Sequence, residues 1–144
     1  MNQTTVTKKK DLPKKWYLID ASNLILGKLS VFAANILRGK NKANFCHYLD
    51  CGDFLVITNT DKVNLSGNKL NTKIYYHHSR YPGGLRETKA SKMLQEKSDR
   101  MVYLAIKGML PHNRLGRKQI SNLFVYKGSE HKHIAQNPEA IKVL

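Results

Sequence analysis

The chain has 144 residues, the length of one ordinary domain, and carries 25 Lys and Arg against 10 Asp and Glu, a formal charge of +15. A chain of this length can bury a hydrophobic core without disulfides or a structural metal. Its charge is self-repulsive unless an anion neutralises it, so we expect a polyanionic partner. Because it has no run of about 18 apolar residues and no apolar signal segment at its start, we expect neither a membrane partner nor export.

The two cysteines, Cys46 and Cys51, are too few for a disulfide framework, which favours reduced thiols in the cytoplasm. Structural zinc sites usually pair their ligands at short spacing twice over, and this sequence has no second thiol pair. We therefore interpret both residues as buried or half-buried free cysteines. We expect no metal and no other cofactor.

The first 15 residues form a polar leader with lysines at positions 8–10, 14 and 15. The leader has too little apolar content to order by itself, so we expect a basic, flexible N-terminal arm. Residues 16–144 are expected to form a single domain with extended basic loops and a C-terminal tail. Its first predicted element is a buried strand over residues 16–20, an aromatic and β-branched run.

A helix is predicted next, because apolar residues recur at three- and four-residue spacing from Leu26 to Leu37. Asp20, Ser22 and Asn23 are candidate caps for its start, and Gly39 is placed to end it in a left-handed conformation. Residues 54–58 are continuously apolar, which predicts a strand covered on both faces of a parallel sheet. Strand, helix and strand together imply a right-handed crossover.

The second half of the chain alternates in the same way. Residues 61–66 fit either a strand or a helical turn capped from Asn59, and residues 73–77 predict a strand before a Pro-Gly-Gly loop. A short helix is expected over residues 90–96, then a second one capped by Ser98 and Asp99. Residues 123–126 predict a last strand before a polar tail. The pattern indicates a three-layer α/β/α domain around a mainly parallel, four-stranded sheet.

Residues 108–118, GMLPHNRLGRK, are the most informative stretch. We predict a rigid basic loop here, restrained by Pro111, with Gly108 and Gly116 permitting tight turns. A loop that is ordered in advance loses less entropy when it binds a polyanion.

Motifs for catalysis are incomplete. The turn at residues 20–27 lacks the glycines that bring a backbone close to a pyrophosphate, and residues 65–69 do not complete a phosphate-binding loop. We also find no nucleophile or paired carboxylate in a catalytic pattern. The chain is therefore expected to bind rather than to catalyse, with no small-molecule substrate.

Two further segments favour RNA. Residues 38–44 contain cations and no acid, which favours contact with phosphates. The same cations would also complement the negative end of the preceding helix, and that role alone could explain them. Residues 75–84 mix aromatic rings, imidazoles and a guanidinium. Flat rings stack on bases, and a guanidinium binds phosphate through two parallel hydrogen bonds. Tyr75 or Tyr76 could instead pack in the core.

The motifs WYLIDA (16–21), LGKL (26–29), LRGKNK (37–42), DCGD (50–53), YYHH (75–78), KGMLP (107–111), LGR (115–117), VY (125–126) and EH (130–131) occur in this order. In order and spacing the chain resembles the bacterial type of the ribosomal protein L13 family, nearly end to end. The lysine-rich leader and Asn137, where the family commonly has Gln, depart from the pattern.

The resemblance implies a structural constituent of the large, 50S-type ribosomal subunit that joins early in assembly, has a three-layer α/β/α fold and is not an enzyme. It also implies a cytoplasmic, ribosomal location and contacts to 23S-type rRNA and neighbouring large-subunit proteins. The family's basic loops correspond here to Arg38, Lys40, Lys42, His77, His78, Arg80, Lys107, Arg114 and Arg117. Lys69, Arg86, Lys118 and His131 complete the candidate rRNA-binding residues.

Two other functions stay open from the sequence. A nucleotide-dependent RNA-modifying enzyme could use the same α/β scaffold, since such folds host many activities. A free regulatory RNA-binding module could use the same basic surfaces away from the ribosome.

Overall fold

The computed structural model describes residue 8 and residues 12–143, so most of the expected N-terminal arm lies outside the described residues. The end of that arm packs on the domain. Leu12 is buried, the Lys14 ammonium lies 2.6 Å from the Asp50 carboxylate, and the Lys15 amide donates to Asp53 at 2.8 Å. Contact with the domain therefore begins before residue 16.

The sheet in the described part of the chain has four parallel strands in the order β5-β2-β1-β6. The strands are β1 (Trp16–Asp20), β2 (Phe54–Thr58), β5 (Leu123–Val125) and β6 (Glu139–Ala140). This arrangement confirms the predicted α/β class and the mainly parallel sheet. The strands predicted at 16–20 and 54–58 are confirmed, and β5 ends one residue earlier than predicted. The two-residue strand β6 was not predicted.

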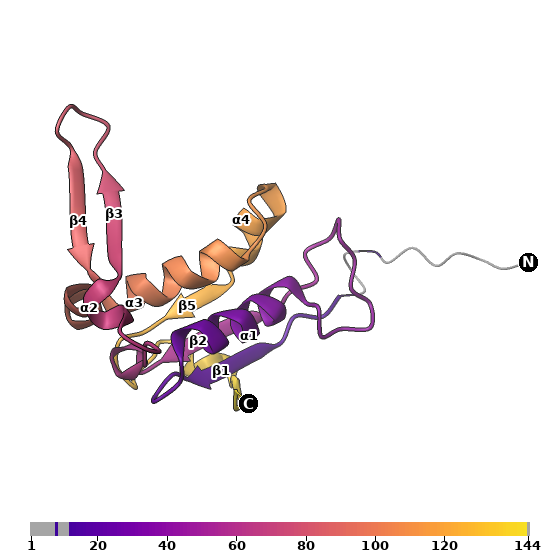
Figure 1. The fold of residues 1–144 in the computed structure, drawn as a ribbon. Coiled ribbons are helices and arrows are strands. Elements are labelled where there is room, and N and C mark those ends of the chain that lie inside the picture. The colour runs from indigo at the N-terminus through magenta and orange to yellow at the C-terminus, as the bar shows by residue number, and fades with distance from the viewer. Residues whose placement is uncertain (1–7, 9–11, 144) are drawn as a thin grey trace, which may run out of the picture.

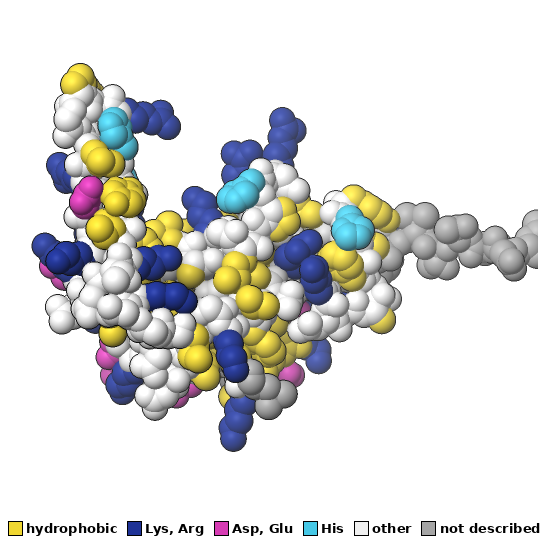
Figure 2. Space-filling model, viewed as in Figure 1, with side chains coloured by type: hydrophobic (Ala, Val, Ile, Leu, Met, Phe, Trp, Pro, Cys, Tyr) yellow, Lys and Arg dark blue, Asp and Glu magenta, His cyan; other side chains and the backbone are white. Residues whose placement is uncertain are grey.

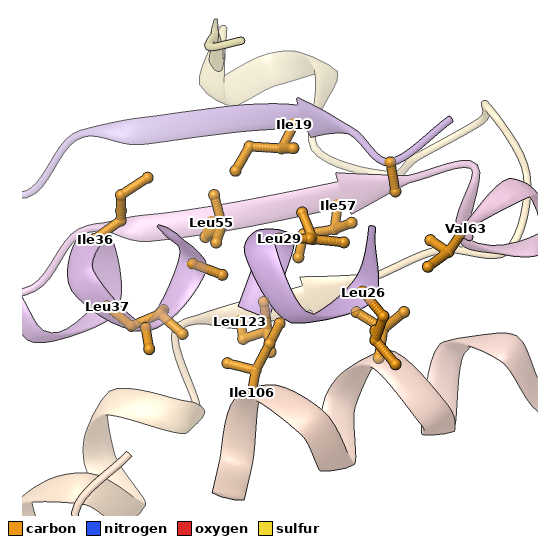
Figure 3. Close-up of a cluster of buried hydrophobic side chains, with 14 of the residues drawn as sticks. Ile19, Leu26, Leu29, Ile36, Leu37, Leu55, Ile57, Val63, Ile106 and Leu123 are labelled. Carbon is orange, nitrogen blue, oxygen red and sulfur yellow. The ribbon is translucent and has the colours of Figure 1, made fainter. Parts of the chain in front are cut away.

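Two helices, α1 (Leu26–Arg38) and α3 (Ala90–Met109), pack side by side against one face of the sheet (Figure 1). Strand alternation points Ile19, Leu55 and Ile57 toward them, where they meet Leu29 and Ile106 in the core (Figure 3). The predicted left-handed end of α1 is confirmed, because Gly39 has a φ of 74° and its amide donates to the Asn35 and Ile36 carbonyls.

An aromatic stack covers the opposite face of the sheet. Trp16 and Phe54 stack with their ring centroids 4.4 Å apart, and Phe124 lies 5.5 Å from Trp16. His133 leans against Phe124 at 4.3 Å, and its Nε2 is 3.0 Å from the Tyr126 hydroxyl. The C-terminal segment, with the short 3-10 helix η3 (Ile134–Gln136), is thereby held on this face.

An antiparallel hairpin of β3 (Ile74–His78) and β4 (Leu85–Lys89) stands out from the body, with its base beside the short helix α2 (Lys69–Thr72) (Figure 1). Strand β3 lies one residue later than predicted. Neither α2 nor β4 was predicted. Four of the five β4 side chains are exposed, so that strand has no alternation of buried and exposed residues to reveal it.

Other local predictions need correction. The cap predicted for α1 is wrong, because Ile25 occupies the N-cap position without a side-chain bond, while Asp20 accepts from the Ser22 amide instead. Residues 60–62 form a 3-10 helix, η2 (Thr60–Lys62), and Asn64 then makes a single parallel bridge to Ile25. The two helices predicted over residues 90–109 are confirmed as two helical segments of α3, because Lys97 between them is not helical, with φ of −139° and ψ of 56°.

The basic loop predicted at residues 108–118 is also wrong in form. Residues 108–109 still belong to α3, and a separate helix, α4 (Arg114–Ile120), begins after the cap residue Asn113. Gly108 and Gly116 are helical and do not make tight turns. The rigidity expected of residues 108–118 therefore comes from their place in α3 and α4 and in the corner between these helices.

Candidate nucleic-acid interface

The corner between α3 and α4 is built by three residues. The Asn113 carboxamide oxygen accepts from the Gly116 amide at 2.7 Å, a cap that supplies a partner for one free N–H at the start of α4. Gly116 packs directly against the Pro111 carbonyl oxygen, so any side chain there would overlap it. The corner is thus fixed by a cap and by close backbone contact.

Cations surround this corner. Lys107, Arg114, Arg117 and Lys118 are all exposed, and Lys107 and Arg117 line a shallow hollow of about 310 Å³ with His112. The structure therefore brings four predicted residues to one end of the molecule. Figure 2 shows Lys and Arg side chains here and on the hairpin, with a hollowed region between them.

A second hollow, of about 440 Å³, lies between the hairpin and α3. The predicted residues His77 and Arg86 line it from the hairpin, where they oppose each other across β3 and β4. Tyr75 lines it too and packs against the hydrophobic core, whereas Tyr76 is 63% exposed. Burial raises the pKa of the Tyr75 hydroxyl above its ordinary value.

Sequence reasoning missed the cations on the other wall of this hollow. Lys92, Lys97 and Arg100 line it from α3. In the sequence these residues are spaced by five and three positions, with Glu96 and Asp99 among them, so no regular basic stripe marks them.

The hairpin tip carries two other predicted residues. His78 Nδ1 accepts from the Arg80 amide at 2.9 Å, and Arg80 has a φ of 68°, in the left-handed region. Both side chains are exposed. The tip therefore presents an imidazole and a guanidinium outward, beside Tyr81, which is 75% exposed.

The remaining predicted residues are scattered. Arg38 and Lys40 lie at the end of α1, Lys69 donates to the Ser66 hydroxyl at 3.0 Å, and half-buried His131 accepts from the His133 amide at 3.3 Å. Lys42 has two protein partners, the Asp53 carboxylate at 2.6 Å and the Pro13 carbonyl oxygen at 3.0 Å. Those bonds give Lys42 a structural role, and its contact with rRNA stays a prediction.

The groups suited to catalysis or metal binding have structural partners. Asp20, at the end of β1, accepts from Asn59 and Ser22, and these hydrogen bonds hold its pKa below the ordinary 3.8. Cys46 is a half-buried and Cys51 a buried free cysteine, as predicted. Across residues 8 and 12–143, the structure has no cluster of three His, Cys, Asp or Glu side chains that could hold a metal. Each helix in this part of the chain is too short or too polar to cross a bilayer.

Comparison with known proteins agrees with the resemblance seen in the sequence. The family model described as ribosomal protein L13 matches residues 14–132. The large ribosomal subunit protein uL13 of Spiroplasma citri is 56% identical over 138 residues, covering 96% of this chain and 94% of that protein. The protein of the same name from Brevibacillus brevis is 51% identical over 143 residues, covering 99% of each chain. This chain therefore belongs to the ribosomal protein L13 family.

Proposed function

We propose that this chain is a structural constituent of the large ribosomal subunit and binds rRNA of the 23S type through two basic surfaces. One is the α3–α4 corner, formed by Lys107, Arg114, Arg117 and Lys118. The other is the hairpin surface, formed by His77, His78, Arg80 and Arg86 with Lys97 and Arg100 of α3. In this account the chain joins early in assembly, contacts neighbouring large-subunit proteins and resides on ribosomes in the cytoplasm.

The observation that carries the proposal is the near full-length similarity to large-subunit proteins, together with where the charge lies. The two surfaces hold cations in clusters with few acids between them, and these clusters sit on structured elements. Phosphate contacts by Lys and Arg give salt-dependent affinity without sequence preference. They also fix the register and orientation of a protein on RNA.

An enzymatic role is not favoured. The family consists of structural ribosomal proteins, and the Asp20 carboxylate at the end of β1, where α/β enzymes bind ligands, is bonded to Asn59 and Ser22. A free regulatory role has no observation in its favour.

Sedimentation tests the proposal. A tagged full-length chain is expressed in growing cells, ribosomal particles are separated on a sucrose gradient in low magnesium, and the chain is quantified by mass spectrometry. We expect it in the large-subunit fraction at one copy per particle. Recovery mainly with small subunits, or free of particles, would contradict the proposal.

A salt wash refines this test. Because phosphate contacts weaken steeply with salt, the chain should leave isolated subunits more readily as the salt concentration rises. A variant with Arg114, Arg117 and Lys118 changed to Gln should leave at lower salt than the unchanged chain. Release of both chains at the same salt concentration would contradict the assignment of the α3–α4 corner to the rRNA interface.

A further inference from the structure

The hollow between the hairpin and α3 has a wall whose side chains share one face of a β-ribbon. Tyr75 pairs with Thr88 and His77 pairs with Arg86, and paired residues of an antiparallel ribbon point to the same side. All four line the hollow. The hairpin thus contributes an aromatic ring near its base, and an imidazole and a guanidinium further out.

The opposite wall is formed by α3. Lys92, Glu96, Arg100 and Leu104 all line the hollow, two on each side of the kink at Lys97. Glu96 is the single acid among the residues that line the hollow, and it is 3.8 Å from Lys92, an exposed pair with little energetic effect. This wall therefore remains cationic, and Leu104 adds an apolar side chain to it.

We propose that this hollow binds an unpaired nucleotide of the rRNA, with the base against Tyr75 and Leu104 and the flanking phosphates on Arg86 and Arg100. This inference rests on the proposed function and specifies which kind of RNA the hairpin surface receives. It assigns contacts with a base to this hollow, in addition to the phosphate contacts that the proposed function requires.

The apolar lining is what selects an unpaired nucleotide over a duplex. A double helix keeps its base faces stacked inside and presents phosphates and 2′-hydroxyls, so Tyr75, Met93 and Leu104 would gain little from it. An unstacked base has an open face that packs on aromatic and apolar side chains. The volume of 440 Å³ also lies within the range of about 300–1,000 Å³ usual for pockets that hold one small ligand.

Charge argues against an apolar protein segment as the occupant. Arg86, Lys92, Lys97 and Arg100 line the hollow against the single carboxylate of Glu96. A chain of phosphates provides a negative charge at every nucleotide, and Arg pairs with phosphate through two parallel hydrogen bonds. An apolar peptide would leave most of these cations without a partner.

A site-directed photocrosslink tests the inference in intact subunits. The full-length chain carries Leu104→p-benzoylphenylalanine, and large subunits are purified and irradiated; Leu104 is 37% exposed and lines the hollow. We expect a crosslink to an rRNA nucleotide that dimethyl sulfate modifies in protein-free rRNA, which identifies it as unpaired. The matched control is Val31→p-benzoylphenylalanine on α1, which is 52% exposed and should not crosslink to that nucleotide.

The same probe at Lys92, whose side chain is 65% exposed at the rim, gives a second position that does not disturb packing. A crosslink to a ribosomal protein, to a paired nucleotide or to nothing, from chains recovered in large subunits, overturns the inference. Absence of the unsubstituted chain from large subunits would instead overturn the proposed function, so the two failures are distinguishable.

A charge variant tests the phosphate contacts separately. In a chain that also carries Arg86→Gln and Arg100→Gln, the crosslink yield from Leu104→p-benzoylphenylalanine should fall by roughly tenfold, a loss typical of hydrogen bonds to charged groups. The chain should still enter subunits through the α3–α4 corner. An unchanged yield would overturn the assignment of the flanking phosphates to these two arginines.

Discussion

Lys42 and Asp53 form an ion pair of 2.6 Å at the start of β2, and the Asp53 side chain is only 5% exposed. The same carboxylate oxygen accepts from the Lys15 amide at 2.8 Å. This one carboxylate therefore joins the segment before β1, the loop after α1 and the start of β2. A lysine that the charge pattern assigned to phosphate binding therefore also holds parts of the fold together.

Replacing this lysine should destabilise the protein. In Lys42→Met the Asp53 carboxylate stays buried with one partner fewer, so the free energy of unfolding should fall by about 2 kcal/mol. Urea denaturation of the isolated chain measures this. The control Lys40→Met removes a neighbouring exposed cation and should change stability by less than about 0.5 kcal/mol. Equal effects of the two variants would contradict the structural role of Lys42.

Two helical glycines should respond oppositely to alanine. A methyl group at Gly116 would overlap the Pro111 carbonyl oxygen, so Gly116→Ala should cost about 1–3 kcal/mol by overpacking. At Gly108 a methyl group would meet no atom within 4 Å, so Gly108→Ala should stabilise α3 by up to about 1 kcal/mol. Thermal unfolding followed by circular dichroism compares them. A stabilised Gly116→Ala variant would show that the corner is not closely packed.

The pKa of Asp20 should depend on the hydrogen bonds that its carboxylate accepts. The Asn59 bond is the main cause of its lowered pKa, and Asn59→Gly removes that bond while tolerating the φ of 55° at this position. The pKa of Asp20, measured by carboxyl-carbon NMR, should then rise toward 3.8. Because the folded pKa is the lower one, the stabilisation is present above the unfolded pKa and is lost as the pH falls through the folded pKa. An unmoved Asp20 pKa would exclude Asn59 as its cause.

The α3–α4 corner should account for part of the salt dependence of rRNA binding. Changing Arg114, Arg117 and Lys118 to Gln removes three phosphate contacts, so the slope of log affinity against log salt should become shallower by about 2–3. Binding to large-subunit rRNA at several salt concentrations measures this slope. The control changes the exposed Lys28, Lys62 and Lys142, which lie on other elements, and should leave the slope nearly unchanged.

The elements that bury a whole face were predictable from the sequence. Strand β2 and helix α1 carry uninterrupted or helically spaced apolar residues, and Gly39 marks the end of α1, so local pattern and tertiary packing agree there. Strand β4 and the two-residue β6 have mostly exposed side chains, which gives pattern reasoning nothing to detect. Their pairing depends on partners distant in the chain.

The sequence predicted which residue types form the candidate interface, but it did not predict the backbone structure that carries them. The charge excess and the aromatic–basic mixture of residues 75–84 pointed to RNA, but Pro111 and Gly116 were interpreted as features of a loop when they fit a helix corner. Sequence charge also cannot distinguish a lysine that faces solvent from one, such as Lys42, whose acid partner lies 11 residues away. Both the helix corner and the Lys42–Asp53 pair depend on contacts that only the folded chain creates.

Lysine footprinting of intact large subunits tests most directly the central claim that the hairpin, α3 and α4 surfaces bind rRNA. Acetylation by a small reagent is quantified by mass spectrometry for the chain in subunits, for subunits digested with ribonuclease, and for the free chain. The account predicts that Lys97, Lys107 and Lys118 are protected in subunits and become reactive after ribonuclease digestion. Reactivity in intact subunits equal to that of the free chain, or protection that survives complete removal of the RNA, would contradict it.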